Sequence, residues 1–447
     1  MIKVLTYGTY DLLHFGHIRL LERAKALGDY LIVGITADDF DKTRGKINVQ
    51  QSLMERIEAV RALGIADEII IEEYEGQKID DIKRYNVDIF TVGSDWRGVF
   101  DYLGEYCKVV YLERTEGVSS SELRSETRAL KLGIVGNGIH ILKYIDESEV
   151  VNGVRVSAVY TESNEILSKL KEKKISASKN YDELLENCDA VYVSSLPKSH
   201  YEHVKKALMN GKHVLCESPV ALKKEQCAKL LSLAKEKEVV LSEGIKTAYS
   251  TAFERLALLI KSGKIGEVVS VDATCTSLRD LHSKENVDYS KLWNSICGWG
   301  PTGLLPVFKI LGTDYVEKRI ITRLLDEDNS FDAFTKIEFL YNSATATVKV
   351  AKGVKSEGEL VISGTKGYVY VPAPWWKTDY FEIRFEDPAD NKRYFYQLDG
   401  EGIRYELVSF VKSISHKQKN IYIEDRVTMA IAEIIEDFYS GKDVTRI

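Results

Sequence analysis

One stretch, residues 7–17, constrains the fold of this chain more than any other, and it reads Tyr-Gly-Thr-Tyr-Asp-Leu-Leu-His-Phe-Gly-His. A strand pattern precedes it at residues 2–7, and an apolar pattern with helical spacing follows it at residues 18–27. A strand therefore ends in a turn that opens a helix, with His14 and His17 at the helix N-terminus. Unpaired backbone N–H groups and the helix dipole make such a place an anion site. The stretch predicts an α/β fold with a phosphate-binding turn.

Composition limits the kinds of partner that we expect. The 447 residues are 44% hydrophobic and 29% charged, which is ordinary for a globular protein of two or three domains. The net charge of -7 and the lack of a long basic run argue against a nucleic-acid polymer as partner. We expect no membrane span and a cytoplasmic location, because no apolar run approaches about 18 residues. The six cysteines have no CxxC spacing, so we expect reduced thiols and no zinc site.

Strand and helix patterns alternate through the first part of the chain. Expected strands are residues 3–7, 30–35, 68–71, 89–92 and 108–112, and expected helices are residues 17–27, 51–63 and 77–85. This alternation predicts a parallel sheet that is covered by helices on both faces. Ligands of open parallel sheets bind beyond the carboxyl ends of the strands. The polar turns of this part fall at that edge, at residues 8–11, 36, 93–96 and 114–117.

Three motifs accompany the HxGH sequence of residues 14–17. They are Gly-Thr-Tyr-Asp at residues 8–11, Gly-Ser-Asp-Trp at 93–96 and Arg-Thr-Glu-Gly-Val-Ser-Ser at 114–120. With these motifs, residues 1–128 resemble the glycerol-3-phosphate cytidylyltransferase family of HxGH nucleotidyltransferases, which usually has Phe at the place of Tyr10. The resemblance implies a Rossmann-like domain that transfers CMP from CTP to glycerol phosphate or a close polyol phosphate and releases pyrophosphate.

The resemblance also implies roles for individual residues. In-line attack on the α-phosphorus needs positioned charge more than a covalent nucleophile. The expected catalytic residues are His14, His17, Lys46 and Arg114. The expected substrate- and nucleotide-binding residues are Gly8, Thr9, Tyr10, Asp11, Arg44, Arg56, Gly93, Asp95, Trp96, Thr115, Gly117, Ser119 and Ser120. Asp11 is also the expected metal ligand, for the Mg²⁺ that accompanies CTP.

Several of these residues have a plainer interpretation. Asp11 alternatively caps a helix N-terminus. Trp96 alternatively serves only as a core residue, and Arg44 alternatively points into solvent from a polar loop. A packing role explains His14 and His17 poorly, because two polar rings beside a glycine at a strand–turn–helix junction pack little.

A second strand-to-glycine-turn start follows at residues 131–138, after a short linker. Strand and helix patterns alternate again to residue 242, and strand-rich runs dominate after residue 245. The characteristic segments are residues 133–138, 211–219, 260–268 and 402–406. Through them the chain resembles the glucose–fructose oxidoreductase, inositol dehydrogenase and MocA family. The resemblance implies a second Rossmann domain over residues 129–245, and an α+β domain with a large, mostly antiparallel sheet over residues 246–447.

The catalytic places of that second family are altered here. Ser218 stands where the family has the lysine of Glu-Lys-Pro, and Pro306 and Ile310 stand for the aspartate and histidine of its later motif. Ile141 occupies the place of the third glycine. Gly136, Gly138 and Glu217 are the remaining expected cofactor-binding residues, so NAD(P) stays open as a cofactor. Glu162 is a candidate ribose partner, and Lys246 and His200 are candidate proton donors.

Two hypotheses for the second part follow. It is a degenerate dehydrogenase that scaffolds, dimerises or binds a sugar or nucleotide ligand, or it is an NAD(P)-dependent reductase that makes the polyol phosphate for the first part. For the whole chain we expect a homodimer that uses CTP and a polyol phosphate, and whose product feeds teichoic acid or capsule synthesis. An adenylyltransferase and a non-catalytic nucleotide-binding protein also stay open, and the acceptor is not determined by sequence.

Overall fold

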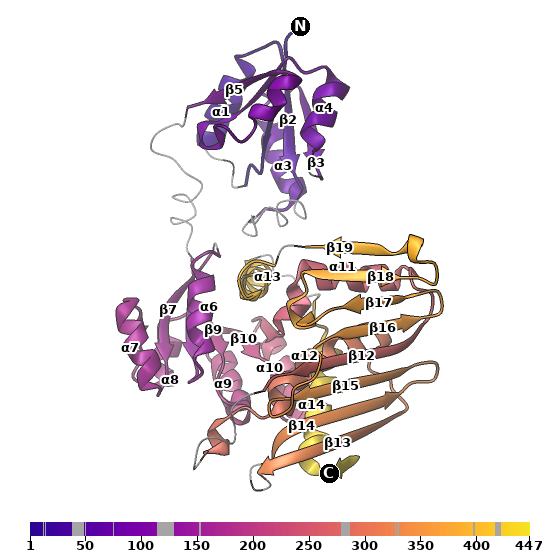
Figure 1. Ribbon diagram of the computed structural model, residues 1–447. Helices are drawn as coiled ribbons and strands as arrows, with labels where there is room; N and C mark the ends of the chain where they lie inside the picture. Colours follow the sequence, from indigo (N-terminus) through magenta and orange to yellow (C-terminus); the bar gives the residue numbers. More distant parts are fainter. Residues whose placement is uncertain are drawn as a thin grey trace. The chain divides into compact units, whose positions relative to one another are not determined.

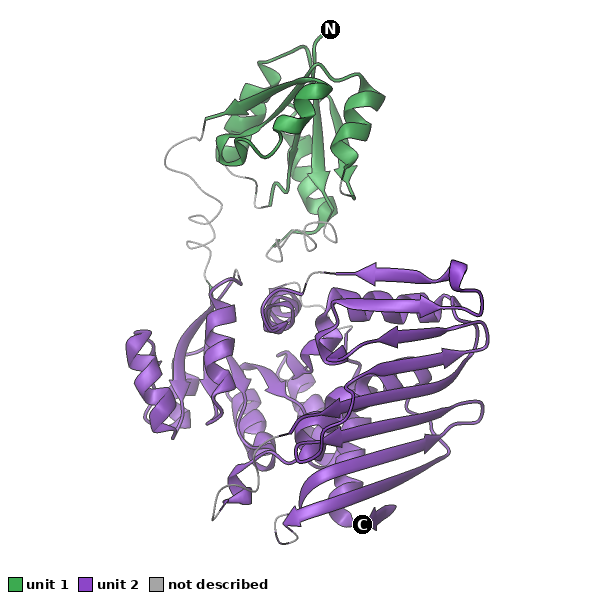
Figure 2. Cartoon of the chain, viewed as in Figure 1, with its two compact units in different colours: residues 1–129 green, residues 130–447 purple. Residues whose placement is uncertain are grey.

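The computed structural model describes the chain except for residues 12, 14, 38–48, 50, 75, 114–128, 152, 279–286, 327, 329, 397 and 416–421. The chain divides into two compact units, Met1–Ala129 and Leu130–Ile447 (Figure 2). Each unit has hydrophobic cores of its own. Among the described helices, none combines the length and apolar character needed to cross a membrane.

Unit 1 is a five-stranded parallel sheet in the order β3-β2-β1-β4-β5 (Figure 1). Its strands are β1 (Lys3–Gly8), β2 (Tyr30–Thr36), β3 (Glu68–Glu72), β4 (Ile89–Gly93) and β5 (Lys108–Leu112). Its helices are α1 (Phe15–Lys25), α3 (Leu53–Ala62) and α4 (Gln77–Tyr85), with the 3-10 turns η1 (Ser94–Trp96) and η2 (Asp101–Glu105). The strand order reverses between β1 and β4, so the topology places a ligand crevice beyond the carboxyl ends of these two strands.

Successive residues of β1 serve the two faces of this sheet. Val4 packs with Leu21 of α1 and Ile57 of α3 on one face. Leu5 packs on the other face with Ile82 of α4 and with side chains around η2. This period-two alternation puts helices on both faces, and it leaves the turns at the strand ends to form the site.

The first sheet of unit 2 has six parallel strands in the order β11-β10-β9-β6-β7-β8. Its strands are β6 (Leu130–Val135), β7 (Val154–Tyr160), β8 (Ser176–Ala177), β9 (Ala190–Val193), β10 (His213–Glu217) and β11 (Leu241–Gly244). Its helices are α6 (His140–Ser148), α7 (Asn164–Glu172), α8 (Tyr181–Glu186), α9 (Pro197–Met209) and α10 (Lys224–Glu236). Here the order reverses between β6 and β9.

The second sheet of unit 2 has nine strands in the order β19-β18-β17-β16-β12-β15-β14-β13-β20. They are β12 (Val268–Thr276), β13 (Glu317–Asp326), β14 (Phe331–Leu340), β15 (Thr345–Ala351), β16 (Leu360–Gly364), β17 (Tyr368–Val371), β18 (Tyr380–Arg384), β19 (Lys392–Phe395) and β20 (Val444–Arg446). The β12–β15 and β13–β20 pairs are parallel, and the other described pairs are antiparallel.

Helices and 3-10 turns complete the second part of unit 2. They are η3 (Lys246–Tyr249), α11 (Thr251–Lys261), η4 (Tyr289–Lys291), α12 (Ser295–Leu311), η5 (Trp375–Lys377), η6 (Pro388–Asp390), α13 (Ile403–Ser415) and α14 (Asp425–Ser440). α12 packs on β12, β14 and β15, and α11 and α14 pack against α12 (Figure 1).

The last two helices return to the first sheet of unit 2. Leu407 and Phe410 of α13 share a core with Leu132 of β6. Ala432 of α14 shares another core with Val135. The predicted fold class is therefore confirmed: two parallel α/β sheets are followed by a large, mostly antiparallel sheet. A division of unit 2 at residue 245 stays a prediction.

Candidate active site

The turn after β1 is supported from inside by Tyr10. This residue adopts a φ of 52°, and a Cβ on Gly8 would lie 2.9 Å from its ring. The side chain is only 2% exposed, and it meets the His17 ring edge-on with centroids 5.5 Å apart. Burial raises the pKa of its phenol. Expected among the nucleotide-binding residues, Tyr10 thus lies in the core, where it positions His17 of α1.

Arg56 of α3 holds the turns of unit 1 together. Its side chain is fully buried, and Nη1 donates to the carbonyl oxygens of Thr9 at 2.7 Å and Thr36 at 2.9 Å. Nε donates to the carbonyl of Gln51 at 3.2 Å. A guanidinium is suited to this work because its donors form a rigid planar fork. Expected to contact phosphate, Arg56 is in this geometry a positioning residue for the turns after β1 and β2.

Asp11 makes a second link to the start of α3. The residue is 2% exposed, and its Oδ1 accepts from the backbone N–H of Gln51 at 2.9 Å. α3 has a cap of its own, in which Ser52 and Glu55 form a capping box. The Asp11 carboxylate thus links the turn after β1 to the segment before α3. This contact differs from the interpretation in which Asp11 caps the N-terminus of α1.

A buried charged network lies behind the ends of β2 and β3. Thr36 Oγ1 donates to Glu72 at 2.9 Å, and Glu72 pairs with Lys78. The Lys78 ammonium lies 4.6 Å from the centroid of the Tyr7 ring, whose hydroxyl donates to Asp81 at 2.5 Å. Sequence reasoning missed Glu72, Lys78 and Asp81, because charged residues at a strand end and in a helix look like a solvated face.

The turn after β4 lies next to the turn after β1, because these two strands are parallel neighbours. Gly93 ends the strand, and Asp95 and Trp96 lie exposed in η1. The Trp96 ring packs against Phe100 with centroids 5.7 Å apart, yet the residue remains 37% exposed. An indole that packs on one side and is accessible on the other can lie against a nucleotide base. The exposed position of Trp96 differs from the interpretation in which it serves only as a core residue.

The structure brings the described candidates of unit 1 to one edge of the sheet. They are Gly8, Thr9, Tyr10, Asp11, His17, Arg56, Gly93, Asp95 and Trp96. The other candidates lie outside the described residues: His14, Arg44, Lys46, Arg114, Thr115, Gly117, Ser119 and Ser120. Within the described part of the chain, no group of three His, Cys, Asp or Glu residues is arranged to hold a metal ion.

In unit 2, a side chain at the start of α6 contacts the end of β9. The His140 ring lies against Gly138, in the space that a Cβ there would need, and bonds the hydroxyl of Ser194. Gly136 has a φ of 152°, and a Cβ on it would meet the Ser194 carbonyl. A dinucleotide would lay its pyrophosphate along this turn, and the imidazole packs against the same turn.

The turn after β6 is also hydrogen-bonded to the end of β7, where the ribose of a dinucleotide would bind. The Asn137 carboxamide oxygen accepts from the Thr161 hydroxyl at 3.0 Å and from the Glu162 N–H at 2.8 Å. The side chain of Glu162 remains exposed. The glycine turn is therefore bonded to the end of β7 by its own asparagine.

Carboxyl groups and phenols gather at the end of β10. Glu217 accepts from Tyr192, Glu406 accepts from Tyr144, and the two phenol rings stack with centroids 3.6 Å apart. Glu406 is 2% exposed, and burial, followed by repulsion from Glu217, raises its pKa to about 8. Ser218, at the place of the family's lysine, donates to the buried Glu243.

The two candidate proton donors of unit 2, His200 and Lys246, do not replace the lysine, aspartate and histidine that the family has. His200 is fully buried, with its ring nitrogens 2.7 Å from the Pro219 carbonyl and 2.8 Å from the Ser195 carbonyl, and burial lowers its pKa to about 4. Lys246 is accessible and faces Glu401. Pro306 and Ile310 lie within α12. These residues do not fit a hydride-transfer site for NAD(P).

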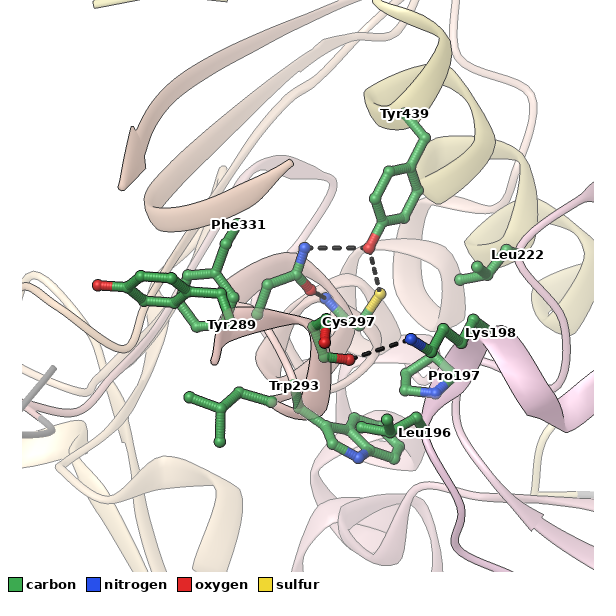
Figure 3. Close-up of a pocket in the computed structure, with 12 residues that line it drawn as sticks. Leu196, Pro197, Lys198, Leu222, Tyr289, Trp293, Cys297, Phe331 and Tyr439 are labelled. Carbon is green, nitrogen blue, oxygen red and sulfur yellow. Dashed lines mark hydrogen bonds between the residues drawn. The ribbon is translucent and has the colours of Figure 1, made fainter. Parts of the chain in front are cut away.

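A small pocket of unit 2 lies between the start of α9 and the helices α12 and α14 (Figure 3). Asn294 donates to the Tyr439 hydroxyl at 3.0 Å, and that hydroxyl lies 3.4 Å from the Cys297 sulfur. Burial raises the pKa of Cys297 to about 12, which keeps the thiol protonated and unreactive. The cavity volume of about 160 Å³ is below the range of small-molecule sites.

Comparisons with known proteins separate the same two parts. The model of the family described as "Cytidylyltransferase-like" matches residues 5–126. Glycerol-3-phosphate cytidylyltransferase of Bacillus subtilis is 48% identical over 130 residues, which are 29% of this chain and 100% of that protein. The enzyme of the same name from Bacillus spizizenii is 45% identical over 130 residues, with the same shares of both chains.

The model described as "Oxidoreductase family, NAD-binding Rossmann fold" matches residues 130–245. Among solved structures, a 3-ketoreductase from Actinomadura kijaniata in complex with NADP and TDP-benzene is similar, with a TM-score of 0.63. The match covers 71% of this chain and 99% of that chain at 17% sequence identity. At this identity the likeness shows the fold alone.

Proposed function

Because the chain belongs to the cytidylyltransferase-like family of nucleotidyltransferases, we propose that unit 1 transfers CMP from CTP to glycerol 3-phosphate or a close polyol phosphate. The observation that carries this proposal is the match of unit 1 to the whole length of curated glycerol-3-phosphate cytidylyltransferases. The gathering of Thr9, Asp11, His17 and Trp96 at the edge where strand order reverses adds physical support.

The proposed mechanism uses these side chains for positioning and charge. An oxygen of the acceptor phosphate attacks the α-phosphorus in line, and the bond to the bridging oxygen breaks as pyrophosphate leaves. His14 and His17 donate hydrogen bonds that strengthen on the phosphate oxygens in the transition state. Lys46 and Arg114 neutralise the triphosphate, and Trp96 walls the base. Asp11, in the β1 turn, is the residue that would hold the Mg²⁺ bound with CTP, and that ion would supply further neutralisation of the phosphate charge.

A two-way substrate screen tests the proposal. Pyrophosphate release is followed with CTP, ATP, UTP and GTP, each against glycerol 3-phosphate, glycerol 2-phosphate, ribitol 5-phosphate and erythritol 4-phosphate. We expect turnover with CTP and glycerol 3-phosphate. Turnover with ATP alone would replace the proposal by an adenylyltransferase, and no turnover with any pair would favour a nucleotide-binding protein.

The biological setting is part of the same proposal. A CDP-polyol is an activated donor for polyol phosphate polymers, so we place the product in cytoplasmic precursor supply for teichoic acid or capsule synthesis, with the chain acting as a homodimer. For unit 2 we propose a scaffolding and ligand-binding role. The support is that His140 packs against the glycine turn and bonds Ser194, and that Ser218 replaces the lysine.

A further inference from the structure

Three lysines of unit 2 surround one carboxylate. Nζ of Lys143 lies 2.9 Å from Glu401 Oε1, and Nζ of Lys377 lies 2.8 Å from Oε2. Lys246 approaches Oε2 at 4.0 Å. The side chains of Lys143, Lys377 and Lys246 are 59%, 39% and 40% exposed, respectively. The Glu401 side chain is 28% exposed. The group is therefore open to solvent.

The charges of this group are out of balance. Among the described ion pairs, three ammonium groups face the one carboxylate of Glu401, which leaves an excess of two positive charges. Lys246 also interacts with the buried Glu406, whose raised pKa of about 8 keeps that carboxyl mostly protonated at neutral pH. Hydrogen bonds from Lys377 and then Lys143 lower the pKa of Glu401 to about 2. The neighbouring Arg404 does not alter the balance, because it pairs with Glu147 at 3.1 Å.

The lysines come from three separate elements whose places are fixed by other contacts. Lys143 is on α6, which packs against α13 (Figure 1). Lys246 in η3 and Lys377 in η5 are joined through their neighbours, since the Thr247 hydroxyl donates to the Trp376 carbonyl at 2.9 Å. The lysines are therefore brought together by the fold and do not follow one another on a single helix.

We propose that Lys143, Lys246 and Lys377 form an anion site that binds the phosphate group of a small phosphate ester, with Glu401 holding the lysines together until the phosphate arrives. A phosphate monoester carries about −1.5 to −2 charges and three strong acceptor oxygens. Both features match an excess of two positive charges on three separate donors. Lysines bind phosphate as mobile point charges.

Exchange of the carboxylate for a phosphate has a low energetic cost. The lysines are 39–59% exposed, so each of their ion pairs with Glu401 is weak. A phosphate dianion that joins the group or displaces Glu401 carries more negative charge than the carboxylate. Two sources of the ester fit this chemistry, namely a polyol phosphate and a nucleotide. The proposal does not depend on the transfer reaction of unit 1.

Residue-resolved lysine labelling tests the site in the full-length chain. An amine-reactive acylating reagent is applied at low conversion, and labelled lysines are quantified by mass spectrometry with and without glycerol 3-phosphate. We expect slower labelling of Lys246 and Lys377 in its presence. Lys198 is the matched control, because it is an exposed lysine of the same unit that binds only the Ser290 carbonyl among its described contacts, at 3.1 Å. Glycerol and potassium chloride at equal ionic strength should protect none of them.

The same labelling experiment is repeated with CTP and with NADPH to identify the source of the phosphate. Protection by glycerol 3-phosphate supports a polyol phosphate ligand, and protection by the nucleotides alone supports a nucleotide ligand. Unchanged labelling of Lys246 and Lys377 with all three compounds would overturn the proposal. The His17→Ala variant separates the two proposals, because it should lose CMP transfer and keep the protection.

A variant of Glu401 distinguishes a ligand site from a purely structural ion network. Glu401→Gln removes the internal competitor, so half-maximal protection should need about tenfold less ligand, equivalent to about 1.4 kcal/mol. Lys246→Ala should instead weaken the protection of Lys377. If Glu401→Gln lowers the melting temperature and leaves the ligand concentration dependence unchanged, the lysines form a structural network and the proposal is wrong.

Discussion

At the scale of single residues, His17 combines the catalytic role that we propose with a fixed position. The Tyr10 ring meets it edge-on, so removal of the imidazole should leave the buried tyrosine in place. We expect His17→Ala to lower kcat for CMP transfer by about 10²–10³, because one donor to the transition-state oxygens is lost. Steady-state kinetics with CTP and glycerol 3-phosphate measure this effect, alongside a melting curve.

The matched control is a histidine of unit 2. His203 is half-buried and interacts with the Ser195 hydroxyl at 2.8 Å, so His203→Asn should leave CMP transfer unchanged. Near-normal turnover of a folded His17→Ala variant would contradict the assignment of His17.

Arg56 provides a second prediction at this scale. Its guanidinium satisfies carbonyls of three separate segments, and hydrogen bonds from charged donors contribute about 1.5–3 kcal/mol each. Because the three bonds share one side chain, their contributions are not additive, and we expect Arg56→Ala to destabilise unit 1 by at least about 3 kcal/mol and to reduce CMP transfer.

The variant Arg56→Lys should recover less than half of the lost stability, because an ammonium cannot span the same acceptors. Urea unfolding followed by Trp96 fluorescence, with the other tryptophans replaced by phenylalanine, measures both variants. Full stability of Arg56→Lys would show that charge alone matters at this position.

The sequence predicts the turn residues of unit 1 better than it predicts their supports. Gly8, Thr9 and Trp96 stand in local motifs next to strand ends, so their place follows from topology. The bond from Arg56 to Thr9 spans 47 residues, and the bond from Gln51 to Asp11 spans 40. Hydrogen bonds between residues so far apart in the sequence form only in the packed fold, and no periodic pattern in the sequence predicts them.

At the scale of elements, apolar periodicity locates helices and strands, and side-chain caps decide where they begin. The helix expected at residues 51–63 is α3, Leu53–Ala62, because Ser52 caps it. The strand expected at residues 30–35 is β2, Tyr30–Thr36. The short strand β20 was missed, since three residues beside a long helix show no pattern of their own.

The burial of Glu406 in α13 makes the stability of unit 2 depend on pH. Its pKa rises from 4.5 to about 8, so the folded chain binds this proton more tightly than the unfolded chain. The associated stability is complete below pH 4.5 and is lost as the pH rises through about 8. We expect Glu406→Gln to flatten this loss and keep the acceptor for Tyr144. Urea unfolding followed by tryptophan fluorescence at several pH values measures it, since four of the five tryptophans lie in unit 2.

Glu401→Gln is the control for this prediction. The pKa of Glu401 is lowered to about 2, so its contribution is present above its ordinary value of 4.5 and lost only below it. This variant should therefore keep the wild-type loss of stability between about pH 5 and pH 8. An equal flattening in both variants would assign the pH dependence to a group other than Glu406.

At the scale of the whole molecule, one chain joins a transferase unit to a unit with a dehydrogenase fold. The second unit lacks the lysine, aspartate and histidine found at the catalytic places of the family that it resembles. We expect no oxidation of NADH or NADPH with dihydroxyacetone phosphate or a keto-pentose phosphate, because Ser218 pairs with Glu243 and cannot supply the lysine's charge. Absorbance at the nicotinamide band, with glycerol 3-phosphate dehydrogenase as positive control, measures this. Steady oxidation would establish the reductase hypothesis.

The return of α13 and α14 to the first sheet of unit 2 has a consequence for how such a chain arises. A gene spliced after residue 129 would pass on a unit with its own complete core. A gene spliced after residue 245 would lack Leu407, Phe410 and Ala432, which close the cores around β6. A cut after residue 129 thus leaves the described core of each unit intact, whereas a cut after residue 245 divides the cores around β6.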